Sequence, residues 1–145
     1  MTIVTARDLG IDVTSADGLF RWLLASFLMG KRIRSSVAVQ TYRVLVYQHG
    51  ADTPGKLARC SHSTLVRLLG QGGYARYDES TARRLHALAS RLEEEWAAQL
   101  KALQAGDLSN EDFKLWILSF EGIGPKTLEI FLRETQGHVW VGDEV

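Results

Sequence analysis

The stretch of residues 120–127, FEGIGPKT, most constrains how this chain can fold, because it separates two amphipathic helical patterns. Ser109 is a typical helix-capping residue, and apolar side chains at helical spacing follow it. Gly122 suits the left-handed conformation that ends many helices, and Pro125 suits the first turn of the next helix. The sequence therefore predicts two helices joined by a Gly-Ile-Gly turn over about residues 109–135. The apolar positions of the first helix are Phe113, Trp116, Ile117 and Phe120, and those of the second are Leu128, Phe131 and Leu132.

A turn of this kind has a chemical consequence. Two glycines let the backbone approach a ligand, and the first N–H groups of the second helix have no acceptor within that helix. Together with the positive end of the helix dipole, these groups favour a bound phosphate. For a bare Gly-x-Gly an ordinary tight corner between helices is the alternative, but the Pro-Lys-Thr run and the flanking hydrophobic helices favour the phosphate site. The candidate residues are Gly122, Ile123, Gly124, Lys126 and Thr127.

Residues 119–134, SFEGIGPKTLEIFLRE, resemble the helix-hairpin-helix (HhH-GPD) of the DNA glycosylase superfamily that includes endonuclease III. A looser likeness, in the order of helices and loops, extends from about residue 20 to residue 137. The resemblance implies an all-helical fold and binding to the backbone of double-stranded DNA without sequence reading. It also implies base excision repair of damaged or abasic sites, and it allows a cation bound by carbonyl groups of the hairpin.

The remaining periodicity predicts an all-α protein, a compact single-domain bundle of six to seven helices. Residues 1–16 are expected to form an N-terminal arm, and residues 17–145 an endonuclease III-like helical domain. Asp17 can cap the first well-marked helix. The expected helices before the hairpin pair span residues 17–30, 37–49, 53–60 (capped by Thr53), 61–70 (starting at Ser61 or Ser63) and 78–104 (capped by Asp78 or Ser80).

The charge of the chain is unevenly distributed. The formal net charge is zero, yet the segment from Arg21 to Arg91 holds 12 Lys/Arg and 3 Asp/Glu, and the rest of the chain carries the balancing net charge of −9. A phosphate backbone responds to local potential, so this asymmetry predicts one basic face. The alternative is that folding mixes the two segments and no basic patch survives.

Two loops add candidates for DNA contact. Residues 31–36, KRIRSS, concentrate three positive charges, contributed by Lys31, Arg32 and Arg34. In the resembling family the loop at this place faces DNA and supplies a polar residue near the extruded nucleotide, close to the position of Lys31. A solvated charged loop is the alternative.

The second loop, residues 70–77, reads GQGGYARY. The resemblance places here a loop that inserts a side chain into the opened duplex. Tyr74 or Tyr77 can stack on a base while Arg76 meets a phosphate, and Gln71 belongs to the same candidate set. The alternative is a flexible loop whose tyrosines fold back onto the core.

Catalysis is a separate question. In bifunctional members of the family a lysine that opens the second hairpin helix forms a Schiff base with the sugar, and an aspartate assists. Lys126 matches that lysine, and Asp143 follows at a spacing close to the family's. In the family more helix follows the aspartate, often with a four-cysteine iron–sulfur segment, whereas this sequence ends at Val145. We therefore expect no iron–sulfur cluster, and a frayed tail around Asp143 unless Trp140 holds it.

The rest of the composition gives no sign of disulfides, metal sites, membrane spans or a secretory signal. A single cysteine, Cys60, permits no internal disulfide and suits a reducing compartment. The four histidines are scattered, so no metal site and no cofactor are expected. No stretch is apolar enough to cross a bilayer, and no secretory signal is visible. The sequence predicts a cytoplasmic, nucleoid-associated protein with no membrane partner.

Three functions remain open at this point. The first is a DNA-binding relative of base-excision glycosylases with glycosylase/AP-lyase activity at Lys126. The second is a non-catalytic, sequence-independent DNA-binding module that works with a repair partner. The third is a protein-contact domain that uses Phe120 and Trp140 at its interface.

Overall fold

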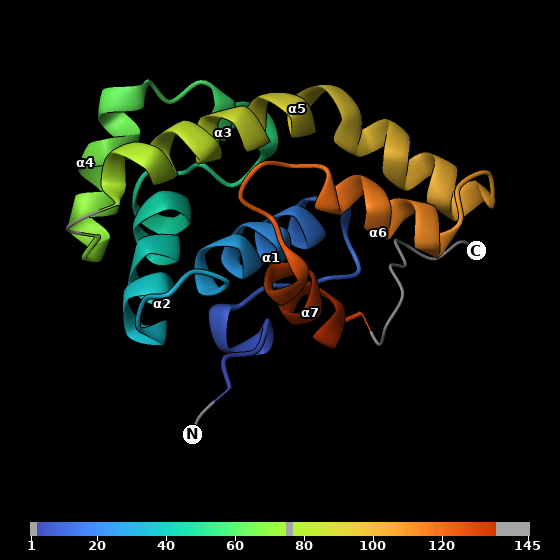
Figure 1. Cartoon of the computed structure of the whole chain (residues 1–145), viewed down its shortest axis with the longest axis horizontal. Helices are drawn as coiled ribbons and strands as arrows, with labels where there is room; N and C mark the ends of the chain where they lie inside the picture. The colour runs from blue at the N-terminus through green and yellow to red at the C-terminus, as the bar shows by residue number, and fades with distance from the viewer. Residues whose placement is uncertain (1–2, 75–76, 136–145) are drawn as a thin grey trace.

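The computed structural model describes residues 3–74 and 77–135, and this part of the chain is all-α with seven α-helices. The predicted fold class is therefore confirmed. In Figure 1, α5 runs along one edge of the molecule, α2 and α4 lie at one end, and α6 lies at the other. The helical elements in order are the 3₁₀-helix η1 (Arg7–Leu9), α1 (Ala16–Met29), α2 (Ser35–Arg43), the π-helix η2 (Val44–Gln48), α3 (Pro54–Ala58), α4 (His62–Gly72), α5 (Asp78–Ala105), α6 (Asn110–Leu118) and α7 (Pro125–Arg133).

The core is built around α1, which is buried at every position from Gly18 to Leu28 except Arg21. It packs against α2 and α7, while α5 packs against α3 and α4. The indole of Trp22 is fully buried and donates a hydrogen bond to the Phe131 carbonyl (3.1 Å), which ties α1 to α7. A helix that is apolar on nearly all sides belongs in the middle of a bundle, and α1 lies there.

Local capping chemistry sets most helix starts. The side chains of Thr53, Ser61 and Ser109 each accept a backbone N–H at the start of α3, α4 and α6. Thr53 and Ser109 were predicted as caps, and of the two predicted starts of α4, Ser61 is the one that caps it. Pro125 occupies the first turn of α7, also as predicted. The cap of α1 is Ser15, whose hydroxyl accepts from the Gly18 N–H at 3.0 Å, so the prediction of Asp17 as cap is wrong. The prediction of Asp78 or Ser80 as the cap of α5 is also wrong, because Tyr77 is the N-cap residue and no side chain caps this helix.

The start of α2 and the end of α4 differ from the sequence prediction. Helix α2 begins at Ser35, directly after the basic loop, and not at Val37. Helix α4 continues through Gly70, where a helix end was predicted, to Gly72. The reason lies in the next two glycines: Gly72 packs so closely on Thr41 of α2 that a side chain there would overlap it, and Gly73 (φ 112°) supplies the left-handed end.

The N-terminal residues pack onto the bundle. Leu9 of η1 is buried, as are Ala6 and Ile11 on either side of this short helix. Across residues 3–74 and 77–135, the helices are too short or too polar for any of them to span a membrane.

Candidate functional site

The α6–α7 turn occupies the residues that the sequence singled out. After α6 ends at Leu118, the Ile123 N–H donates to the Phe120 carbonyl (3.1 Å), and Gly122 takes the left-handed conformation with φ 90°. The side chain of Ile123 is buried and anchors the turn in the core. Gly124 is extended (φ −118°, ψ −170°), and its carbonyl accepts the first hydrogen bond of α7.

The start of α7 leaves its backbone donors open. Gly124 is the N-cap residue and offers no side-chain acceptor, and a Cβ built there would meet nothing within 4 Å. No side chain therefore caps the first N–H groups of α7, which lie at the positive end of the helix dipole. Thr127 is 2% exposed, and its hydroxyl lies against Gly30 at the end of α1. The side chains of Thr127 and Ile123 are thus structural, and only their backbone groups are left for a ligand.

Lys31 is joined to this turn from the α1–α2 loop. Its ammonium donates a 2.7 Å hydrogen bond to the Gly122 carbonyl and lies 4.2 Å from the ring centroid of Phe27. Burial, and secondarily the nearby charge of Arg84, lowers the pKa of Lys31. The resemblance allows a cation on the hairpin carbonyl groups; in the structure an ammonium group binds the carbonyl of Gly122.

Two arginines of α5 complete the surroundings of the turn. The side chain of Arg84 packs against Gly122 and pairs weakly with Glu121 (3.4 Å). Arg91 donates to the Ser119 hydroxyl (3.1 Å), and its guanidinium lies 3.9 Å from the ring centroid of Phe120. Phe120 is only 4% exposed beneath this arginine, so it is not available for the protein interface considered above.

A carboxylate holds Arg91 in place. Glu95 accepts from Arg91 through both oxygens (3.0 and 3.2 Å) and from the Trp116 indole of α6 (2.7 Å). These hydrogen bonds, from Arg91 first and Trp116 second, lower the pKa of Glu95. Neither Arg84 nor Arg91 was among the sequence candidates. The only sequence feature that could have pointed to Arg91 is its i,i+4 spacing from Glu95, and this spacing is common on exposed helix faces.

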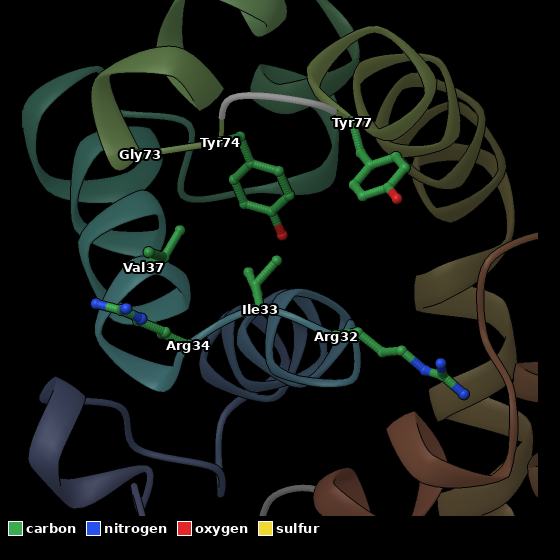
Figure 2. A pocket seen from close by; sticks show the side chains of 7 residues that line it. All are labelled: Arg32, Ile33, Arg34, Val37, Gly73, Tyr74 and Tyr77. Carbon is green, nitrogen blue, oxygen red and sulfur yellow. The ribbon is translucent and has the colours of Figure 1, made fainter.

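Next to the turn, residues of the basic loop, with Gly73, Tyr74 and Tyr77, line an open cavity of about 380 Å³. A second cavity of about 190 Å³ continues toward α5. Figure 2 shows the ring of Tyr74 extending into the gap with its hydroxyl toward Ile33, and Tyr77 on the α5 side. Both cavities are lined by Arg32, Ile33, Tyr74 and Tyr77; Arg34, Val37 and Gly73 complete the first, and Lys31, Ser80, Thr81 and Arg84 the second.

One of the two tyrosines folds back onto the core, and the other is exposed. Tyr74 folds inward and is 5% exposed, and its hydroxyl has no hydrogen-bond partner among the described residues. Tyr77 is 60% exposed. Gln71 lies on the exposed surface of the last turn of α4, and Arg76 falls outside the described residues.

Of the two predicted catalytic residues, Lys126 lies in the described part of the chain and Asp143 does not. Lys126 is 64% exposed on the first turn of α7, with Glu129 at 3.8 Å. It borders a separate cavity of about 170 Å³, together with Met29 and Ile130, that shares no residue with the two described above. Asp143 and Trp140 lie outside the described residues.

No group of three or more His, Cys, Asp or Glu side chains within residues 3–74 and 77–135 could hold a metal ion. Comparison of the chain with known proteins found no matching family model, no matching curated protein and no matching solved structure.

Proposed function

We propose that this protein binds double-stranded DNA through the sugar–phosphate backbone, with the α6–α7 turn as its main phosphate contact. The observation that carries the proposal is the uncapped start of α7 at Gly124, which is open to solvent and stands in the same turn as Gly122. Unpaired helix N–H groups and the helix dipole are suited to a phosphate oxygen. Lys31 and Arg84, which pack against Gly122, add positive charge beside it.

The nearest carboxylates do not oppose this assignment strongly. Glu121 pairs with Arg84, and Glu129 lies within ion-pair distance of Lys126. Contacts between backbone amides and phosphates carry no base information, so binding is expected to tolerate any sequence. It is also expected to weaken as salt rises, with the logarithm of the affinity falling by about 0.9 per contacted phosphate for each decade of salt.

The test compares the two turns of the molecule. Gly124→Asp places a negative charge in the phosphate position without a steric clash, and aspartate is itself a good helix cap, so the fold is preserved. The matched control is Gly106→Asp at the α5–α6 turn, roughly 30 Å away along α5 from the contact of Arg84 with Gly122.

We expect Gly124→Asp to lower duplex affinity at least about tenfold, because like charges repel at close range. Gly106→Asp should leave the affinity within about twofold of wild type. Affinity is measured by fluorescence anisotropy on several unrelated duplexes at low salt. Equal binding by wild type and Gly124→Asp would remove the turn from the DNA contact.

A second candidate function is AP-lyase chemistry, and the position of Lys126 favours it. Its exposed amine follows Pro125 on the same open turn of α7, beside the proposed phosphate contact. Such an amine can attack C1′ of an open-chain abasic sugar and form an imine with loss of water, and β-elimination then breaks the strand on the 3′ side. This activity would make the protein a relative of base-excision glycosylases in function as well as in its hairpin sequence.

Borohydride reduction separates the two functions, because an imine is trapped as a covalent protein–DNA adduct. With abasic duplex, the lyase function predicts an adduct that Lys126→Gln abolishes and Lys101→Gln, an exposed lysine of α5, does not. Tight binding without trapping or nicking would assign Lys126 to phosphate contact and leave a non-catalytic DNA-binding module.

A further inference from the structure

Lys31 differs from the other lysines in its surroundings. Three lysines lie 3.1, 3.2 and 3.8 Å from a carboxylate oxygen, namely Lys56, Lys114 and Lys126. Lys101 is exposed on α5. Lys31 is only partly exposed, and it forms no ion pair with another described residue. Its amine is instead held at the Gly122 carbonyl, beside the ring of Phe27.

These surroundings favour the neutral amine of Lys31. Burial first, and the charge of Arg84 second, lower its pKa. Glu121, the acidic residue of the adjacent turn, pairs with Arg84 at 3.4 Å and not with Lys31. The Gly122 carbonyl accepts an N–H from the amine in either protonation state, so it positions the group without requiring the charge. A larger fraction of Lys31 than of an exposed lysine is therefore the neutral amine, whose lone pair can attack carbon.

The cavity of about 190 Å³ that Lys31 lines is suited to a small anion. Lys31, Arg32 and Arg84 give it three cationic side chains, and no carboxylate is among the described residues that line it. Arg32 is exposed and extends away from the basic loop on the side of Tyr77 (Figure 2). A cavity lined by one sign of charge concentrates ions of the opposite sign. Its volume lies below the range of about 300–1,000 Å³ that is usual for ligand sites, so it suits a molecule of only a few carbon atoms.

We propose that Lys31 is a nucleophile that forms an imine with a small anionic aldehyde, whose phosphate or carboxylate group is held by Arg32 and Arg84. The amine lone pair forms a C–N bond to the aldehyde carbon, and the π pair of the carbonyl group moves to oxygen. A proton passes from nitrogen to that oxygen, and loss of water then leaves the C=N bond. The step needs no oxidant or reductant. It goes beyond the proposed function, because neither DNA nor α7 takes part in it.

The experiment compares two aldehydes that differ in charge, glyceraldehyde 3-phosphate and glyceraldehyde. Each is incubated with the full chain and cyanoborohydride near neutral pH, so that any imine is reduced to a stable amine. Mass spectrometry of peptides then measures the rate of labelling at each lysine. The phosphorylated aldehyde should label Lys31 at least about tenfold faster than Lys101, and the neutral aldehyde should show a smaller preference. Labelling of Lys31 by the phosphorylated aldehyde at or below the rate of Lys101 would overturn the proposal.

Two arginine variants test the anion-binding part of the site. Arg32→Gln and Arg84→Gln should each slow labelling of Lys31 by the phosphorylated aldehyde about threefold to tenfold and slow labelling by the neutral aldehyde less. Arg32 is exposed, so its replacement should leave the fold intact. The matched control is Arg83→Gln, at an exposed position of α5 that lines neither cavity, and its rate should stay within about twofold of wild type. Wild-type rates in both Arg32→Gln and Arg84→Gln would refute the anion site.

The pH dependence of labelling by the neutral aldehyde tests the nucleophile itself. Because the pKa of Lys31 is lowered, its rate should level off at a lower pH than the rate of Lys101. Arg84→Gln should move the Lys31 profile to higher pH, because it removes one of the two causes of the lowered pKa. Coinciding profiles for Lys31 and Lys101 in the wild type would contradict the role of Lys31. These experiments contain no DNA, so their outcome is independent of the phosphate contact proposed for α7.

Discussion

The α5–α6 turn and the α6–α7 turn both pass through a glycine in the left-handed conformation, Gly106 with φ 83° and Gly122 with φ 90°. Their surroundings differ. A side chain at position 106 would meet nothing within 4 Å, whereas one at position 122 would meet Phe27, Arg84 and Lys31. The helix after the first turn is capped by the Ser109 side chain, whereas the helix after the second has no side-chain cap.

The comparison shows which features a turn needs only to reverse the chain and which features the proposed phosphate contact would need in addition. A reversal requires only a residue that tolerates positive φ and partners for the exposed backbone groups, and the α5–α6 turn has both. In the α6–α7 turn, Lys31 binds the Gly122 carbonyl, the side chain of Arg84 packs against Gly122, and no side chain caps the first amide groups of α7. These uncapped amide groups are the ones that the proposed phosphate contact would use.

The largest expected difference between the turns is in tolerance of a methyl group. Gly122→Ala combines strain at positive φ with contacts of 3.0 Å to Phe27 and 3.2 Å to Arg84. We expect it to lower the free energy of unfolding by about 3 kcal/mol, from left-handed strain and overpacking together. Gly106→Ala carries the strain alone and should lower it by about 1 kcal/mol. Urea denaturation followed by circular dichroism measures both.

This pair of variants tests whether packing behind Gly122 matters. If both variants lose the same free energy, the contacts of Gly122 with Phe27 and Arg84 add nothing to the backbone strain. The comparison between the turns would then rest on the open amide groups of α7 alone.

The next largest effect concerns the lysine behind the turn. Lys31→Met keeps the aliphatic stem over Phe27 but removes the hydrogen bond to the Gly122 carbonyl. We expect a loss of about 1.5 kcal/mol, since hydrogen bonds from charged groups are stronger than neutral ones and burial of the ammonium offsets part of the gain. The matched change near the other turn is Lys101→Met, at an exposed position of α5, and should stay within about 0.5 kcal/mol of wild type. Equal stabilities of the two variants would show that the Lys31 hydrogen bond is energetically neutral.

The backbone of the α6–α7 turn could be predicted from sequence because its determinants are local. Ser109, Gly122 and Pro125 act on residues within a few positions of themselves, through capping, positive φ and a fixed φ. The same local reasoning found the cap Thr53 and placed the start of α4 at Ser61 or Ser63. It failed to predict that α4 continues through Gly70. The position of Gly72 depends on its contact with Thr41 on another helix, and local sequence rules do not include such contacts.

The surroundings of the turn could not be predicted for the same physical reason. The Lys31–Gly122 hydrogen bond joins residues 91 positions apart, and the Arg91–Ser119 hydrogen bond joins residues 28 apart. Both depend on how α1 and α5 pack against the turn. Tyr74 is buried and Tyr77 is exposed, and the sequence had left both outcomes open for each of them.

Helix capping should act in opposite directions at the two turns. Ser109→Ala removes the cap of α6 and should destabilise the protein by about 1 kcal/mol. Gly124→Ser adds a cap to α7 at a position that is extended and unobstructed, and should stabilise it by a few tenths of a kcal/mol. The new hydroxyl would accept an N–H that we assign to a phosphate, so duplex affinity should fall while stability rises. A variant that gains stability and keeps full affinity would contradict the assignment of these amide groups to DNA.

The last expected effect, a small loss of stability, tests the ion pair that holds Arg91 against the α6–α7 turn. Glu95 fixes Arg91, which in turn covers Phe120 and reaches Ser119, and the carboxylate is about one-third exposed. Hydrogen bonds from Arg91 and then Trp116 lower its pKa, so its contribution to stability is present above the ordinary glutamate pKa and is lost as the pH falls through the lowered value. Glu95→Gln should therefore cost about 0.5 kcal/mol at pH 7, and the difference from wild type should shrink as the solution is acidified below about pH 4.5. Urea denaturation at pH 7 and at several pH values below 4.5 measures this difference.

The matched change beside the other turn, Glu111→Gln, alters a carboxylate that is 83% exposed and paired with Lys114, and its effect at pH 7 should be smaller. If Glu95→Gln matches wild type at every pH, the Arg91–Glu95 pair does not stabilise the turn, and α6 is held by the packing of Phe113 and Ile117 in the core.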